Sequence, residues 1–234
     1  NNFYMMNGES LPYLLRNDSM ITIILFASLM LVAYVLSNGK KHLIQQLKYL
    51  IVNRERNNLF DNSTTGYAHY TPLLILHTCM LSGVCLYYYS ANTQPALFQL
   101  YPHSLLLGGY VGSILILLLA KYLCYGFINW IFFDKISNKA WINIYNNSII
   151  WSGFFLLPII LLVVYFDLSL IISLFLVFIV IIISKIVLFY RGFSIFFKNF
   201  YGCFHLILYL CALEILPDVL LWESIVLINQ FLLQ

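Results

Sequence analysis

The chain has 234 residues, of which 62% are apolar and only 9% are charged, and its formal net charge is +3. A soluble domain carries roughly 25% charged residues, so this composition excludes an ordinary water-soluble protein and indicates an integral membrane protein. The length allows about six spans of roughly 20 residues each, with their connections. No sizeable water-soluble domain fits beside them, and we therefore predict a single membrane domain over residues 1–234.

Long apolar runs favour helices over a β-barrel, whose strands show about ten residues of alternating polarity. The sequence therefore predicts an all-α, polytopic transmembrane helical bundle. Lys121 interrupts the third span, and we expect its long stem to carry the ammonium group to the membrane interface. The six spans are expected at residues 20–37, 71–90, 104–131, 147–166, 168–190 and 200–221. The short connection from Tyr165 to Ser169 predicts that the fourth and fifth spans form an antiparallel hairpin.

The first connection, residues 38–70, begins with an amphipathic segment. Leucines recur on one side at helical spacing, and the opposing side carries Lys40, Lys41 and Lys48. This pattern predicts a helix at about 40–52 that lies on the cytoplasmic surface of the membrane. The three lysines are candidate docking residues for a partner or for anionic lipid, and a plain interfacial linker is the alternative.

Basic residues are distributed very unevenly between the two sides of the predicted bundle. Of the 12 lysine and arginine residues, only Arg16 falls on the side that holds the termini. Because cytoplasmic loops carry the excess of Lys and Arg, both termini are expected outside the cytoplasm. The basic flanks predict contact with anionic lipid headgroups and not with nucleic acid.

Small residues recur four apart in the third span, with Gly108 one turn from Gly112 and Gly109 one turn from Ser113. This spacing lets the backbones of membrane helices approach closely. We expect this face to pack against another helix of the same chain, and a homodimer formed through it is the alternative.

A single glutamate stands in the apolar sixth span. Asp218 follows Glu214 by one turn, with Pro217 between them. An ionisable group at membrane depth usually faces the bundle interior and has a partner. We expect Glu214 to be a neutral acid that donates a structural hydrogen bond to another helix, and a proton relay is the alternative.

The depth of Glu214, counted from the expected outer end of its span at residue 221, suggests which side chains could contact it. Tyr87, Tyr110 and Ser113 are expected at similar depths. Lys185 is expected near the inner end of the fifth span, so the same count excludes it as a direct partner.

Two histidines, His77 in the second span and His205 in the sixth, are expected in the cytoplasmic leaflet. Facing histidines on neighbouring helices can hold a haem. Nothing in the sequence makes these two spans neighbours, so we expect core or interfacial histidines and neither a metal nor a cofactor. No catalytic motif of a known kind is found, which makes an enzyme the minority interpretation.

Three segments, LRNDSMITIILF, RGFSIFFKNF and above all FHLILYLCALEILPD, resemble an uncharacterised integral-membrane family of Bacteroidota, domain of unknown function 4271. The resemblance implies a multi-pass protein of the bacterial inner membrane, which puts both termini in the periplasm. It implies no known reaction. The positions at which it implies shared function are Arg191, Gly192, His205, Cys211, Glu214 and Pro217.

The expected function is that of a noncatalytic scaffold or accessory subunit in a cell-envelope machine, with a protein partner there. A small transporter or ion-coupled permease that uses Glu214 and Asp218 is the first alternative. A haem-binding or redox protein that uses His77 and His205 is the second.

Overall fold

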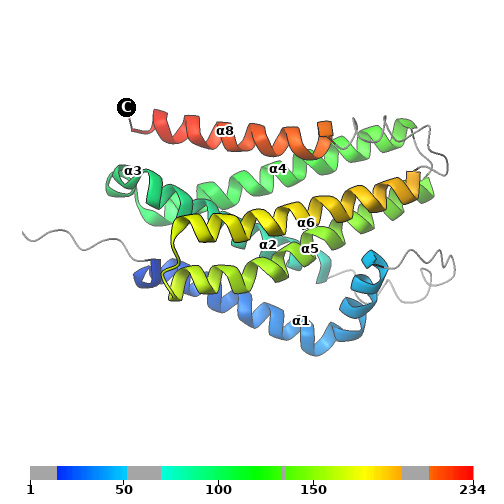
Figure 1. The fold of residues 1–234 in the computed structure, drawn as a ribbon, viewed down its shortest axis with the longest axis horizontal. Coiled ribbons are helices and arrows are strands. Elements are labelled where there is room, and N and C mark those ends of the chain that lie inside the picture. Colours follow the sequence, from blue (N-terminus) through cyan, green and yellow to red (C-terminus); the bar gives the residue numbers. More distant parts are fainter. Residues whose placement is uncertain (1–14, 52–69, 133–134, 197–210, 234) are drawn as a thin grey trace, which may run out of the picture.

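A computed structural model of the chain describes residues 15–51, 70–132, 135–196 and 211–233 (Figure 1). This described part contains helices and no strand, which confirms the predicted all-α class. The elements are η1 (Leu15–Asn17), α1 (Ser19–Ile51), α2 (Tyr70–Thr93), α3 (Pro95–Leu100), α4 (His103–Phe132), α5 (Lys135–Tyr165), α6 (Leu170–Phe196), the π-helix η3 (Cys211–Ile215) and α8 (Leu216–Phe231).

Five helices of the described part are long and apolar enough to cross a membrane, and they match the first five predicted spans. The fourth begins well before the predicted residue 147, because polar side chains that interrupt the apolar run are accommodated inside the bundle. Asn146 accepts a hydrogen bond from Tyr122 of α4, and Asn147 is buried. The five segments are Ser19–Lys40, Tyr70–Thr93, His103–Ile131, Ser137–Tyr165 and Leu170–Gly192.

The sixth predicted span, 200–221, lies partly outside the described residues. The helix described there continues to Phe231 and does not end at residue 221. Asn229 explains the difference, because this polar residue is buried between helices. It accepts a hydrogen bond from the Tyr110 hydroxyl at 3.1 Å and donates one to the Ser90 hydroxyl at 3.3 Å.

The segment predicted as a separate surface helix is continuous with the first span. Helix α1 runs without interruption to Ile51, so the helical structure expected for residues 40–51 is present. Figure 1 shows that α1 changes direction sharply in its last part.

Helices α2 and α5 form the centre of the bundle, and the other long helices surround them. Half of the most apolar stretch of each of these two helices is buried, compared with 11% for α4 and for α6. Helix α2 packs against α4 and α5, and α5 packs against α6. The outer faces of α4 and α6 are therefore exposed to the surroundings of the bundle.

A tight connection turns α5 back into α6, as the short polar stretch in the sequence predicts. Asp167 adopts a positive φ of 49° there, and the Tyr88 hydroxyl of α2 donates to the Leu168 carbonyl oxygen at 2.7 Å. Figure 1 shows that this connection lies at the same end of the molecule as η1 and the C-terminal end of α8.

Close helix approach occurs at glycines other than those singled out in the sequence. A Cβ atom added at Gly83 of α2 would lie 3.0 Å from the Val111 Cα of α4. By contrast, no described atom lies within 4 Å of a Cβ added at Gly108, Gly109 or Gly112. The expectation that this glycine face packs within the chain is therefore wrong for the described residues, because α4 meets α2 through Val111. The homodimer stays a prediction.

We predict that Gly83→Ala destabilises the bundle by about 1–3 kcal/mol, because the added methyl group meets backbone that cannot move independently. The matched control is Gly108→Ala, which adds the same methyl group to an open surface of α4. It should leave the free energy of unfolding unchanged or raise it slightly, since Ala favours helix over Gly by about 1 kcal/mol. Thermal unfolding in detergent measures both, and equal effects would contradict the assigned crossing point.

Candidate functional site

The candidate site begins on the buried side of α4, where two polar side chains lie one turn apart. Lys121 is only 4% exposed and Tyr125 only 1%. Their spacing of four residues places both on one face of the helix. That face points toward η3 and α8, so an ammonium group and a phenol hydroxyl are both presented to the carboxylates there.

The carboxylates come from a short π-helix and the first turn of the helix that follows it. Glu214 lies in η3 and Asp218 in the first turn of α8. Pro217 has no backbone N–H with which to bond the Leu213 carbonyl four residues earlier, which fits a local departure from the α-helical pattern. π-Helical turns of this kind are rare and occur frequently at functional sites.

Lys121 connects α4 to both carboxylates. Its ammonium nitrogen Nζ lies 3.2 Å from Glu214 Oε2 and 2.6 Å from Asp218 Oδ1. The same nitrogen donates to the Glu214 carbonyl oxygen at 3.2 Å. All three ammonium donors of Lys121 therefore have acceptors in η3 and α8.

Lys185 makes the matching contacts from α6. Its Nζ atom contacts Glu214 Oε2 and lies 2.8 Å from Asp218 Oδ2. It also donates to the Glu214 carbonyl oxygen at 3.3 Å. We call Lys121, Lys185, Glu214 and Asp218 the four-charge cluster, since every cation in it contacts every anion.

The second oxygen of Glu214 accepts a hydrogen bond from the Tyr125 hydroxyl. The Tyr125 ring in turn contacts two aromatic rings of α5, Tyr145 at a centroid distance of 5.1 Å and Trp141 at 5.5 Å. Helix α5 thus fixes the phenol that reaches Glu214, and both carboxylate oxygens of Glu214 act as acceptors.

With all four groups ionised, the net charge of the cluster is zero. The side chains of Lys121 and Glu214 are only 4% and 5% exposed, whereas those of Lys185 and Asp218 are 29% and 37% exposed. Charges in such surroundings require opposite charges and hydrogen bonds to offset their lost hydration. Removal of any one member, or protonation of either carboxylate, therefore leaves an unbalanced charge inside the bundle.

The cluster corrects two expectations about Glu214. Lys185, which the depth count had excluded, is a direct partner, and Glu214 accepts hydrogen bonds where it was expected to donate one. The count failed because it placed the helix end at residue 221. With the end at Phe231, Glu214 lies about 26 Å from that end at 1.5 Å per residue, at the level of the lysines.

Lys121 is also placed differently from the expectation, because its ammonium group points into the bundle and not to an interface. None of the three hydroxyls suggested by depth has a described contact with Glu214. Tyr87 contacts His103 and Asp18, and Tyr110 contacts Asn229, while Ser113 bonds within its own helix. Tyr125, one turn from Lys121, was missed, although its spacing from a lysine in an apolar span was a usable signal.

Two further candidates in the described part of the chain, His77 and Arg191, have no described contact with the cluster. His77 is buried on α2 beside the Phe154 ring, with Nε2 lacking a hydrogen-bond partner among the described residues. Arg191 is buried near the end of α6. His205 lies outside the described residues, so the pairing of His77 with His205 remains a hypothesis.

The proposed docking lysines all lie in the C-terminal part of α1. Lys40 is exposed, and Lys41 and Lys48 belong to the same helix. Their role in docking a partner or anionic lipid stays a prediction.

A comparison with known families gives one match that covers most of the chain. A family model described as Domain of unknown function (DUF4271) matches residues 21–225, which include all four members of the cluster. No curated protein matches the chain, and no solved structure does.

We predict strong energetic coupling between Lys121 and Glu214. Either Lys121→Gln or Glu214→Gln alone should lower the free energy of unfolding by about 3–5 kcal/mol, because each leaves a buried charge unbalanced. The double variant restores the balance and should cost about 1–3 kcal/mol less than the sum of the singles. Unfolding of all four proteins in detergent gives the coupling energy.

The matched control is the ion pair of Arg16 with Asp167, whose atoms lie 3.7 Å apart and whose side chains are both 50% exposed. Its coupling energy should be about 0–1 kcal/mol. Additive effects at Lys121 and Glu214 would show that the cluster contributes no more than this surface pair.

Proposed function

The chain belongs to the DUF4271 family, and we propose that it is a proton-coupled membrane transporter whose coupling site is the four-charge cluster. One observation carries this proposal. Two carboxylates share two lysines between α4, α6 and α8, within a chain that has at least five helices of membrane-crossing length. Ionisable groups at such positions mark ion pathways and proton relays in membrane proteins.

Protonation of one carboxylate supplies the switch in this mechanism. A proton on Asp218, the most exposed member, changes the charge of the cluster from zero to +1 and removes one attraction to each lysine. Glu214 alone then balances two ammonium groups. Because Lys185 joins α6 to α8 only through these carboxylates and the Glu214 carbonyl among its described contacts, protonation weakens the α6–α8 junction.

The proposal assigns distinct roles to two neighbouring tyrosines and to the π-helix. Tyr125 holds Glu214 in place while the lysine contacts change, and Tyr145 packs behind Tyr125 to fix its ring. The π-helix η3 lets the Glu214 carbonyl reach both lysines, so backbone and side chain are released together.

A noncatalytic scaffold or accessory subunit of a cell-envelope machine is the second candidate. The observation that favours it is the completeness of the cluster, in which each lysine contacts both carboxylates. A balanced set of this kind can serve as a permanent structural connection between helices. The two candidates differ in whether the junction responds to pH.

Hydrogen exchange of the chain in lipid nanodiscs distinguishes them. After correction for intrinsic rates, the transporter proposal predicts that protection of the amides around Asp218 falls about tenfold when the medium is acidified from about pH 8, an effect of about 1.4 kcal/mol. A variant with Gln at both lysines and at Glu214, and Asn at Asp218, carries no titrating group in the cluster and should show no pH dependence.

Amides of the α5–α6 connection near Asp167 provide an internal reference for general effects of acid. Protection around Asp218 that does not change on acidification, while the reference amides stay protected, would overturn the transporter proposal and leave the scaffold. In that case, stable copurification of a protein partner from native membranes is the result that the scaffold requires.

We further propose that the chain resides in a bacterial inner membrane with both termini in the periplasm. The support is the distribution of Lys and Arg outside the four-charge cluster. Arg16 lies on the side of the termini, and the other basic residues that remain after Lys121 and Lys185 are left out lie toward the opposite side. A reporter that is active only outside the cytoplasm should be active when fused after Gln234 and silent when inserted within residues 53–65. The reverse pattern would contradict the orientation.

A further inference from the structure

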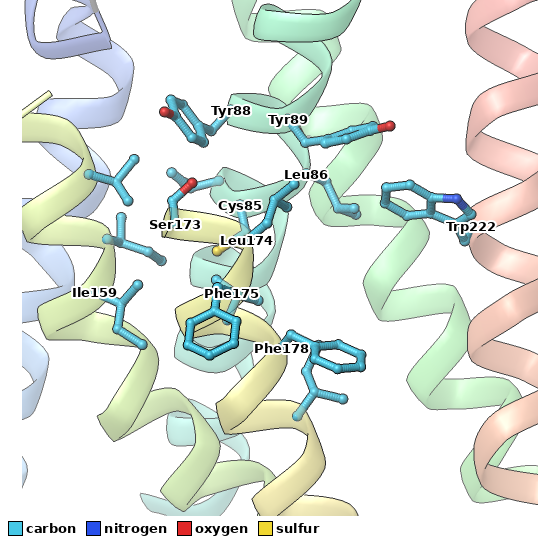
Figure 2. Close-up of a pocket in the computed structure, with 15 residues that line it drawn as sticks. Cys85, Leu86, Tyr88, Tyr89, Ile159, Ser173, Leu174, Phe175, Phe178 and Trp222 are labelled. Carbon is cyan, nitrogen blue, oxygen red and sulfur yellow. The ribbon is translucent and has the colours of Figure 1, made fainter. Parts of the chain in front are cut away.

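An apolar cavity of about 640 Å³ lies between α2, α5, α6 and α8. Figure 2 shows Phe175 and Phe178 of α6 on one side and Trp222 of α8 on the other, with Cys85 and Leu86 of α2 behind them. Phe175 and Phe178 are both exposed, so the cavity opens toward the outside of the bundle along α6. In a membrane protein, that direction faces lipid.

The chemistry of the cavity suits a hydrocarbon. Its lining is almost wholly apolar, and two of its few hydroxyl groups are engaged elsewhere. The Tyr88 hydroxyl donates to the Leu168 carbonyl oxygen at 2.7 Å, and the Ser173 hydroxyl donates to the Leu170 carbonyl oxygen at 2.8 Å. A polar ligand would therefore lose its hydration here with few groups to replace it.

The two ends of the cavity differ. Ser173 and Tyr88 lie at the end next to the α5–α6 connection, where the helices of the bundle terminate. At the other end, Ile181 precedes Lys185 by one turn, whereas the Trp222 ring lies beside Tyr89 (Figure 2). The ion pairs that connect α6 to α8 in the four-charge cluster therefore lie one turn beyond Ile181, the last lining residue of α6.

The dimensions favour a narrow occupant. From Ser173 to Ile181 the cavity follows α6 for about 12 Å at 1.5 Å per residue. A volume of about 640 Å³ over that length gives a mean cross-section of about 50 Å², roughly half that of an α-helix with side chains. The 15 lining residues are also fewer than the roughly 20–30 per side of a standard protein interface.

We propose that this cavity is a binding site for one acyl chain of a bilayer phospholipid, which enters from the side between α6 and α8. Its glycerol end lies near Ser173 and Tyr88, and its methyl end approaches the four-charge cluster. Tyr89 and Trp222, whose ring centroids are 4.7 Å apart, close the cavity between α2 and α8 (Figure 2). Such amphipathic rings are enriched near membrane interfaces. This site does not depend on the transport proposal.

The test uses the full chain in nanodiscs that contain phosphatidylethanolamine with a photoreactive diazirine in the middle of one acyl chain. Adducts are mapped by mass spectrometry. We expect adduct yields at the cavity residues Leu86 and Val177 to exceed those at Leu119 and Leu123, which are exposed on α4 outside the cavity. The α4 residues measure ordinary contact with surrounding lipid.

Two matched variants on α6 separate the cavity from the general lipid surface. Ile181→Trp fills the inner part of the cavity, whereas Ile183→Trp adds the same ring to a residue of similar exposure that does not line it. Ile181→Trp should lower the adduct yield at Leu86 about tenfold, the ratio for about 1.4 kcal/mol of lost binding. Ile183→Trp should leave that yield unchanged.

Val177→Phe is a second variant that fills the cavity, and it should lower the adduct yield at Leu86 as Ile181→Trp does. It replaces Ile181→Trp if thermal unfolding measurements show that Ile181→Trp is poorly folded. Equal adduct yields in the cavity and on α4, or yields at Leu86 that neither filling variant lowers, would overturn the proposal. Crosslinks at Leu86 to a second protein chain in place of lipid would overturn it as well.

Discussion

The four-charge cluster is the interaction on which the arrangement of the outer helices depends. Helix α6 packs against α5, and α8 packs against α4, so these two outer helices are attached to different helices of the bundle. Lys185 reaches from α6 to the carboxylates of α8 and η3, where Lys121 of α4 meets it. Because unbalanced charge is unfavourable inside an apolar bundle, the register of α8 is specified by four groups that must coincide.

The same interaction relates the cluster to the neighbouring cavity. Ion pairs connect Lys185 of α6 to the carboxylates of η3 and α8, and the apolar cavity between α6 and α8 begins at Ile181, one turn before Lys185. A change of charge at Asp218 and the presence of a hydrocarbon beside Trp222 would therefore act on the same junction. The apolar cavity and the buried charge site could therefore influence each other through this junction.

Much of the architecture could be predicted from the sequence because it depends on local composition. Apolar length predicted the spans, and the stretch between Tyr165 and Ser169 predicted the hairpin of α5 and α6. Glu214 and Asp218 were singled out because carboxylates are rare in apolar helices. The partners of these carboxylates were not predicted, because a depth count is only as accurate as the helix end from which it starts. The helix extends past the predicted end at residue 221 to Phe231, and its polar residue Asn229 is buried.

The sequence by itself determined that this chain forms helices long and apolar enough to cross a membrane, and that Glu214 and Asp218 stand one turn apart near its C-terminal end. Both conclusions follow from properties within one helix, namely apolar length and a spacing of four residues. Only the tertiary structure decided that Lys121, Lys185 and Tyr125 contact these carboxylates. It also decided that Gly83, and not Gly108, lies at a helix crossing. Contacts between helices depend on which faces turn toward each other, and every apolar span offers several faces of nearly equal hydrophobicity.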